Sequence, residues 1–276
     1  MTSGRNDDEL LNPAPEHIER RPVTVAARLL LGGPVVLVTA SHRGQHNVMP
    51  LAWCAPLSGD PPLVGIAVEQ SRHTAEMVSH SEEFALNFPS RQLLHHVQYL
   101  GALSGSDIDK FEATQLETFA PEHITAPLIE GCVAWVECEV QQVVPIGDHL
   151  LFVGLPVSVQ VDPQAFDETW TADESAGEVD SRPLHFLGGN RYSALEGVTE
   201  ARLPSPGEAP ERALAERIEE ELELSREARE RREEQLGELE REVEAGNVID
   251  IAKVALDELP ELEDIPRIVV PEREEP

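Results

Sequence analysis

A short run of polar residues, SRHT at positions 71–74, offers the clearest chemistry in this 276-residue sequence. The run precedes a predicted helix, Thr74–His80, and combines hydroxyl groups with the Arg72 guanidinium. Free backbone N–H groups at a helix N-terminus, together with such side chains, suit a terminal phosphate. Arg72 is also one of only four basic residues within positions 44–190, against 21 acidic ones. We therefore expect an anion-binding site at this helix start.

Three other stretches can contribute to the same site. They are the extended segment Asn47–Trp53 (NVMPLAW), the end of a predicted strand at Phe84–Asn87 (FALN), and Lys110 within DIDKF. The backbone of Phe84–Asn87 can present hydrogen-bond donors and acceptors to the edge of a flat heterocycle. Each stretch also has a purely structural interpretation, since a tryptophan such as Trp53 more often packs in a core than against a cofactor. Spacing alone indicates a β-barrel that binds a small anion.

Several common site types are absent from the sequence. There is no phosphate loop, dinucleotide G-x-G-x-x-G, zinc C-x-x-C pair or H-E-x-x-H motif, so no metal site is expected. Cys132 and Cys138 are six residues apart on one predicted strand, so we expect them to point the same way and to be buried. Three cysteines in all do not make a disulfide framework. His95 and His96 have no acidic partner three or four residues on, which favours a surface position.

The composition excludes some partners. The formal net charge is −31, and both nucleic acid and anionic lipid require a basic surface, so neither is an expected partner. No apolar stretch approaches the roughly 20 residues of a membrane helix. The first ten residues contain no apolar region typical of a signal peptide, so we expect a cytoplasmic protein. The scarcity of lysine and excess of acid fit either adaptation to high salt or a GC-rich genome.

Local patterns predict a mainly β fold with a few short helices. Turn residues separate many short apolar runs, and regular βαβ alternation is absent, which favours an antiparallel barrel over a doubly wound sheet. The predicted helices are Val23–Leu31, Thr74–His80 and Arg91–Leu100. The predicted strands are Val35–Ala40, Asn47–Leu57, Pro62–Val68, Glu83–Phe88, Cys132–Val144, His149–Val161 and Leu184–Leu187, with a hairpin turn at Gly147-Asp148.

The chain divides into four predicted parts. Residues 1–20 form a mobile arm, 21–197 the barrel, 198–210 a proline-rich linker, and 211–276 an acidic helical extension and tail. The charged helix 211–245 has apolar residues near heptad spacing, but arginines occupy the middle of that seam. A coiled coil and a solvated helix packed on its own barrel therefore remain equal alternatives. Residues 248–259 are a candidate second helix.

Four segments resemble, in order, the flavin reductase-like, FMN-binding split-barrel family. These segments are 47–90, 104–140 (which begins SGSDIDKF), 147–154 (GDHLLFVG) and 184–192 (LHFLGGNRY), and together they span nearly all of residues 21–193. The resemblance implies an antiparallel six-stranded split barrel that forms a homodimer. It also implies that FMN is held without covalent attachment at the dimer interface.

The resemblance also implies a role for particular residues. Lys110 and His149 lie in family motifs that place them near the open flavin face or the cofactor phosphates, with His149 a possible nicotinamide-side residue, and His185 and Tyr192 are weaker candidates. Two positions depart from the family pattern: Gly131 replaces a frequent acid, and Ser106 replaces an arginine of an S-G-R pattern. The remaining implied flavin-binding residues are Asn47, Met49, Ala52 and Trp53 along the ring and ribityl chain, Arg72, His73 and Thr74 at the phosphate, and Phe84, Ala85, Leu86 and Asn87 at the polar edge of the ring.

These features favour an FMN-binding oxidoreductase that takes a hydride from NADH or NADPH and passes electrons to an unknown acceptor. The chemistry would come from the flavin, so no catalytic side chain is required. An alternative is a flavoredoxin-like electron carrier that exchanges electrons with a protein partner and oxidises no nicotinamide directly. The missing arginine at position 106 favours this alternative. A third possibility is a helical assembly protein whose barrel has lost flavin.

Overall fold

The computed structural model describes residues 21–171, 182–195 and 210–244. The chain forms two compact units, Met1–Thr199 and Glu200–Pro276. The predicted arm at residues 1–20, the linker before Pro210, the candidate helix at 248–259 and the acidic tail lie outside the described residues.

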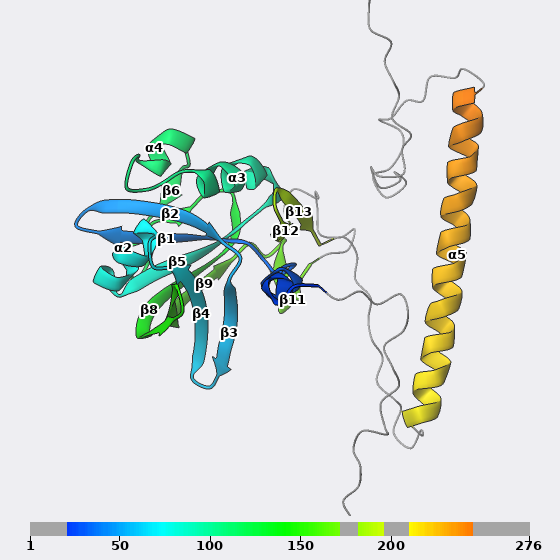
Figure 1. Cartoon of the computed structure of the whole chain (residues 1–276), viewed down its shortest axis with the longest axis horizontal. Helices are drawn as coiled ribbons and strands as arrows, with labels where there is room; N and C mark the ends of the chain where they lie inside the picture. The colour runs from blue at the N-terminus through cyan, green and yellow to red at the C-terminus, as the bar shows by residue number, and fades with distance from the viewer. Residues whose placement is uncertain (1–20, 172–181, 196–209, 245–276) are drawn as a thin grey trace, which may run out of the picture. The chain divides into compact units, whose positions relative to one another are not determined.

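An antiparallel sheet of seven strands dominates the first unit (Figure 1). Its order is β2-β1-β5-β8-β9-β4-β3, so the two edge strands are consecutive in the chain. The strands are β1 (Val36–His42), β2 (Gln45–Leu51), β3 (Cys54–Gly59), β4 (Pro62–Glu69), β5 (Glu83–Pro89), β8 (Cys132–Ile146) and β9 (His149–Val161). The sheet confirms the predicted class, a mainly antiparallel split barrel with short helices, but it has seven strands where six were expected, because the segment 47–57 forms two strands.

The segment predicted as one strand, Asn47–Leu57, is two strands. β2 pairs only with β1 and β3 only with β4, so the chain passes between opposite edges of the sheet at Ala52-Trp53. The Trp53 carbonyl still accepts a hydrogen bond from the Ala67 N–H of β4 (2.9 Å). The junction therefore lies between the two edges of the sheet, and its residues line cavities described below, Trp53 the second and Ala52 the third.

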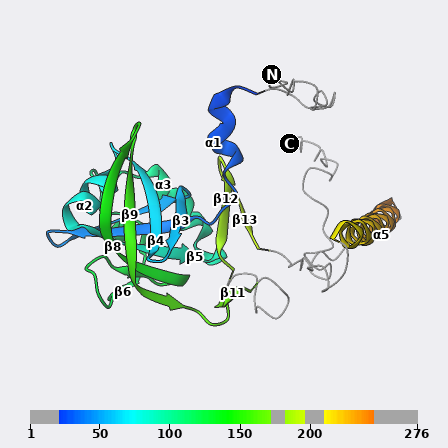
Figure 2. The same ribbon diagram turned by 90° about the horizontal axis from the view of Figure 1, so that it is seen from below.

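Short helices and strands surround this sheet (Figure 2). The helices are η2 (Val23–Val25), α1 (Ala26–Leu29), α2 (His73–Ser81), η3 (Arg91–Leu93), α3 (Leu94–Ala102) and α4 (Lys110–Thr114). The short strands are β6 (Thr118–Phe119), β7 (Leu128–Ile129), β10 (Phe166–Asp167), β11 (Thr169–Trp170), β12 (Leu184–Gly188) and β13 (Arg191–Ala194). Gly147 has a φ of 59° between β8 and β9, as expected for the predicted hairpin.

The core lies on both faces of β1. Val38 points into a cluster with Phe84 and Phe152, whereas its neighbour Leu37 points into a second cluster that includes Leu100. Successive side chains of a strand point to opposite faces, so β1 is buried on both sides. This burial explains why its sequence is almost continuously apolar. This burial fixes β2 and α3 against it, and both of them line the cleft described below.

The prediction that Cys132 and Cys138 point the same way is wrong. Cys132 lies in the cluster around Leu37 and Cys138 in the cluster around Phe84. The register of β5 against β8 slips between Phe88 and Pro89, and this bulge inverts the alternation along β8. Both thiols are buried, as predicted, and burial raises the pKa of Cys138 to about 12. Neither cysteine has the depressed pKa of a reactive thiol.

A long connection, residues 103–131, joins α3 to β8 and is held to the barrel by buried polar groups. The Glu137 carboxylate accepts hydrogen bonds from the backbone N–H groups of Glu122, His123 and Ile124, at 2.7–3.2 Å. The Thr39 hydroxyl donates to the Pro127 carbonyl (2.7 Å). These bonds satisfy backbone groups that would otherwise be buried without partners, so the far part of the connection has one fixed path.

The second unit contains one long helix, α5 (Pro210–Glu244). Its large apolar side chains include Leu214, Ile218, Leu222 and Leu224, each more than half exposed. Neither of the two predicted arrangements of this helix, a coiled coil or a helix packed on the barrel, is tested by the structure, so both stay predictions. No helix within the described ranges is both long enough and apolar enough to cross a membrane.

Candidate functional site

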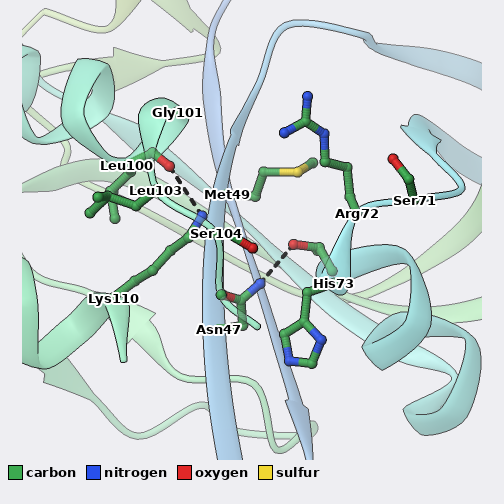
Figure 3. A pocket seen from close by; sticks show the side chains of 12 residues that line it. Asn47, Met49, Ser71, Arg72, His73, Leu100, Gly101, Leu103, Ser104 and Lys110 are labelled. Carbon is green, nitrogen blue, oxygen red and sulfur yellow. Dashed lines mark hydrogen bonds between the residues drawn. The ribbon is translucent and has the colours of Figure 1, made fainter. Parts of the chain in front are cut away.

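A polar cavity of about 120 Å³ opens between β2, the start of α2 and the end of α3 (Figure 3). A second cavity, of about 210 Å³, continues it toward the β2–β3 junction. Met49, Arg72 and Gly101 line both cavities, so the two form one cleft. The other lining residues are Asn47, Ser71, His73, Thr74, Leu100, Leu103, Ser104, Gly105 and Lys110 in the first cavity, and Pro50, Leu51, Trp53, Ala67, Glu69 and His149 in the second.

The first cavity contains the predicted helix start. Thr74 lies in the first turn of α2 and is buried, yet it lines the cavity. Its Oγ accepts a hydrogen bond from Asn47 Nδ2 (2.8 Å), and its own hydrogen has no acceptor among the described residues. His73 is half-buried and lies 3.6 Å from the Glu76 carboxylate. The helix start therefore presents a hydroxyl donor to the cleft, as the sequence predicts.

Lys110 extends into the same cavity from the opposite wall. Only 4% of its surface is exposed, and Nζ donates one hydrogen bond, to the Leu100 carbonyl (3.1 Å), with no acidic partner in the described part of the chain. Burial, and secondly the nearby Arg72 guanidinium, lower the pKa of Lys110 from 10.5 to about 8. A buried ammonium with unused donors is costly unless an anion joins it, so Lys110 is a candidate ligand for an anion.

Arg72 forms the third positive element of the cleft. Its Nε donates to Glu69 Oε2 (3.1 Å), and the Ser71 hydroxyl donates to Glu69 Oε1 (2.9 Å). The Arg72 Nη groups form no hydrogen bond or ion pair with another described residue, so they remain available to a ligand. Glu69 thus fixes the base of the guanidinium and leaves its outer donors free.

An aromatic pair borders the second cavity. The Trp53 indole and the His149 imidazole are stacked, with ring centroids 4.7 Å apart and planes at 20°. The His149 Nδ1 lies 2.6 Å from Asp148 Oδ1, and this hydrogen bond lowers the pKa of the Asp148 carboxyl. Trp53 is 46% exposed, although tryptophan is usually well buried. The pair offers a flat, partly apolar surface beside the first cavity.

A third cavity, of about 290 Å³, adjoins the cleft at Pro50, Leu51 and Gly101. It contains two of the predicted residues, Ala52 and Tyr192. The Tyr192 hydroxyl donates to Gln98 (2.9 Å), and partial burial raises its pKa. His185 lines neither this cavity nor the cleft, and its ring nitrogen Nδ1 lies 2.9 Å from the Gly32 carbonyl oxygen.

The structure does not bring Phe84, Ala85, Leu86 and Asn87 to the cleft. All four are buried, and β5 is paired on both sides, with β1 and β8, so its backbone groups are already hydrogen-bonded. The Asn87 amide donates to the Leu37 carbonyl (2.8 Å) and accepts from the Ile129 N–H (2.9 Å). The expected presentation of backbone groups by residues 84–87 therefore has no support in this structure.

Several residues of the cleft were not found from the sequence, among them Glu69, Gly101 and Gly105. Glu69 lies at the end of β4, two residues before the SRHT run, and its spacing to Arg72 is the only sequence signal for their pairing. Gly105 has no local signal, because the overlap that a Cβ there would make with Asn47 depends on tertiary packing, and Gly101 meets Pro50 only at an ordinary contact distance. Both contacts depend on the packing of α3 and the following loop on β2.

The cleft fits a ligand with a phosphate at one end and a flat ring at the other. The unused donors of Thr74, Lys110 and Arg72 supply a hydroxyl and two cations to the phosphate end. Trp53 and Met49 supply apolar surface at the other end. In the ranges that the structure describes, no group of three or more His, Cys, Asp or Glu side chains is arranged to hold a metal ion.

Comparison with known proteins identifies the family of the chain. Residues 28–193 match the family model described as "Flavin reductase like domain". The chain therefore belongs to the flavin reductase-like family, and it carries a flavin reductase-like, FMN-binding domain.

Two relatives show that the more similar sequence is uncharacterized and that a named flavin reductase is less similar. An uncharacterized protein of Archaeoglobus fulgidus is 39% identical over 110 residues, which are 40% of this chain and 62% of that protein. A flavin reductase of Pseudomonas putida is 26% identical over 121 residues, 44% of this chain and 68% of that protein. The match thus spans less than two thirds of the archaeal relative, and the named reductase is more distant.

Solved structures share the fold. The FMN-binding protein of Thermus thermophilus, crystallised with p-hydroxybenzaldehyde, has a TM-score of 0.55 and 26% identity, covering 73% of this chain and all of that one. A flavoredoxin of Methanosarcina acetivorans has a TM-score of 0.55 and 27% identity, covering 63% of this chain and 91% of that one. Both an FMN-binding protein and a flavoredoxin are therefore similar to the first unit.

Proposed function

We propose that this protein is an FMN-dependent oxidoreductase of the flavin reductase type, which oxidises NADH or NADPH and delivers the electrons to a separate acceptor. The observation that carries the proposal is the convergence of Lys110, Thr74 and Arg72 on one cavity that continues to the Trp53–His149 pair. When bound, FMN supplies the redox chemistry, because its ring accepts a hydride and no side chain here can store one.

The side chains divide the binding task between them. Lys110 and Arg72 neutralise the phosphate, and the Thr74 hydroxyl donates to one of its oxygens. Met49 and Trp53 cover part of the ring and exclude water from it. His149, which contacts Asp148, lines the second cavity, and we assign it to the side on which a nicotinamide ring would enter. Neither NADH nor NADPH is favoured by these contacts alone.

A flavoredoxin-like electron carrier is the second candidate. One observation favours it: Ser106 stands where the family pattern has an arginine, and its hydroxyl bonds only to neighbouring Ser104 and Asp107. The site thus lacks a cation that would attract a second, phosphate-bearing cofactor. The similarity to the Methanosarcina flavoredoxin supports the same candidate. In this alternative, a protein partner exchanges electrons directly with the bound flavin.

We also propose that the first unit forms a homodimer. Several large apolar side chains of the first unit are exposed. They include Trp53 beside the cleft, Leu57 on β3 and Val159 on β9, and Val159 is 62% exposed. Such side chains on an otherwise acidic protein are suited to a protein interface. Sedimentation equilibrium of the full chain would give twice the monomer mass, and a monomer at high protein concentration would contradict the dimer.

An anaerobic titration separates the candidates. The full chain, saturated with FMN, is mixed with NADH and with NADPH in parallel, and the visible flavin absorbance is followed. Bleaching by either nicotinamide supports the reductase. FMN that binds but is bleached by neither contradicts the reductase and supports the carrier, whereas a chain that binds no FMN contradicts both.

Two variants control for the site. Arg72→Ala should lower FMN occupancy, whereas Arg91→Ala removes the same charge from the exposed start of η3 and should not. Equal loss in both variants would indicate a general effect of charge on this acidic chain instead of a specific phosphate contact.

A further inference from the structure

The buried amide of Asn47 connects the two walls of the anion cavity. Asn47 lies on β2 and is 3% exposed. On one side its Nδ2 donates to the Thr74 hydroxyl of α2 (2.8 Å). On the other side lies Gly105, where a Cβ atom would overlap Asn47 Oδ1, so only glycine allows the loop to approach this closely. Asn47 therefore touches both the helix start and the loop that leads to Lys110.

The direction of the Asn47–Thr74 bond determines where the Thr74 proton points. An amide nitrogen only donates, so the Thr74 oxygen is the acceptor in this bond. Its own hydrogen must then point elsewhere, and the residue lines the cavity. A hydroxyl that accepts one hydrogen bond is polarised and becomes a stronger donor. Asn47 thus leaves the Thr74 hydroxyl as a donor directed to the cavity that Lys110 enters.

We propose that Asn47 is a positioning residue for phosphate, which acts by keeping the Thr74 hydroxyl in the donor orientation. The identity of the phosphate as that of FMN rests on the proposed function, but the role itself concerns any phosphate monoester. An aspartate at this position has nearly the same shape and the opposite hydrogen-bonding character. Its carboxylate would accept the Thr74 proton, turn it from the cavity and add a negative charge beside the phosphate.

The experiment compares the full-length wild-type chain with Asn47→Asp, Thr74→Val and Asn190→Asp. Asn190→Asp is the matched control, because it makes the same chemical change at an exposed position between β12 and β13. The probes are FMN, riboflavin, which lacks the phosphate, and inorganic phosphate. At pH 7.5, Asn47→Asp and Thr74→Val should each weaken FMN binding by about 10- to 100-fold. Riboflavin binding, a check on folding, should change less than about twofold in all variants.

A pH series distinguishes positioning from a merely structural role. The carboxyl of Asn47→Asp can donate to Thr74 again once it is protonated, so lowering the pH to 5.5 should narrow its gap to wild type in FMN binding. Thr74→Val has no such group and should not recover. Asn47→Asp that keeps the wild-type preference for FMN over riboflavin would overturn the proposal, and so would equal loss of both flavins without recovery at low pH.

Inorganic phosphate keeps this test separate from the proposed function. If the wild-type chain binds neither flavin, the proposed function fails, but thermal stabilisation by phosphate can still be compared between wild type and Asn47→Asp. Stabilisation of wild type that is lost in Asn47→Asp and kept in Asn190→Asp supports the positioning role. A wild-type chain that phosphate does not stabilise and that shows no preference for FMN overturns it.

Discussion

Replacing Lys110 with methionine tests the anion cavity most directly, because the side chain keeps its length and loses its charge. In the ligand-free protein the pKa of Lys110 is lowered from 10.5 to about 8 by burial and by Arg72. Below pH 8 the folded state therefore carries a buried charge at a cost of about 3 kcal/mol, from about 1.4 kcal/mol per pKa unit. Lys110→Met should be more stable than wild type at pH 7 by up to this amount.

The pH dependence of stability has a defined sign. Between pH 8 and 10.5 the unfolded chain still holds the lysine proton that the folded chain has released, so the free energy of unfolding of wild type should rise with pH. Lys110→Met lacks this group, and its stability advantage should disappear over the same interval. Urea denaturation at pH 7, 8, 9 and 10 measures both effects.

Binding of FMN should reverse the shift in the Lys110 pKa. A phosphate dianion beside the amine favours its charged form, so at pH 8 binding should take up about half a proton, rising to about 0.9 at pH 9. Calorimetry in buffers of different ionisation enthalpy measures this uptake, and Lys110→Met should abolish it while weakening FMN by about 1.5–3 kcal/mol. FMN affinity unchanged in the variant, or no proton uptake by wild type at pH 8, would refute the placement of phosphate at Lys110.

Three other predictions follow from contacts described above. Arg72→Ala should weaken FMN by about 1.5–3 kcal/mol and leave riboflavin unchanged, since a charge-assisted bond to phosphate is lost; equal effects on both flavins in a fluorescence titration would contradict this. Removal of residues 203–276 should leave FMN affinity unchanged, because every cleft residue precedes that segment; loss of binding would mean that the segment completes the site. Glu137→Gln should lower the free energy of unfolding by about 1–3 kcal/mol, because the amide cannot accept from all three N–H groups. An unchanged urea midpoint would show that these three hydrogen bonds contribute little to stability.

The local features of the fold were predictable because each has a local cause. Short apolar runs bounded by turn residues predicted the strands, and Gly147-Asp148 predicted the β8–β9 hairpin that the structure contains. The break at Ala52-Trp53 was missed, because the sequence remains apolar there and only the separate pairing of β2 and β3 reveals it. The bulge that separates Cys132 from Cys138 likewise depends on the register of a neighbouring strand.

The part of the candidate cleft at the start of α2 was predictable. A hydroxyl and a guanidinium at a helix start are adjacent in sequence, so their chemistry is visible without tertiary structure. The burial of Lys110 was not visible, because it depends on the end of α3 ten residues away. The placement of Asn87 failed for the opposite reason: its amide group is fully used between Leu37 and Ile129 inside the sheet, a long-range pairing that no local pattern indicates.

The way the connection between α3 and β8 is fastened has a consequence for how this protein can diversify. Its distal half is fixed to the barrel by Glu137 and Thr39, whereas Ser104, Gly105 and Lys110 of its proximal half line the cleft. Exchanges in this proximal half can therefore alter the lining of the cleft without removing the bonds that hold the distal half, whereas a side chain at Gly105 would overlap Asn47. For laboratory evolution of new specificity, this short stretch is the natural place to randomise.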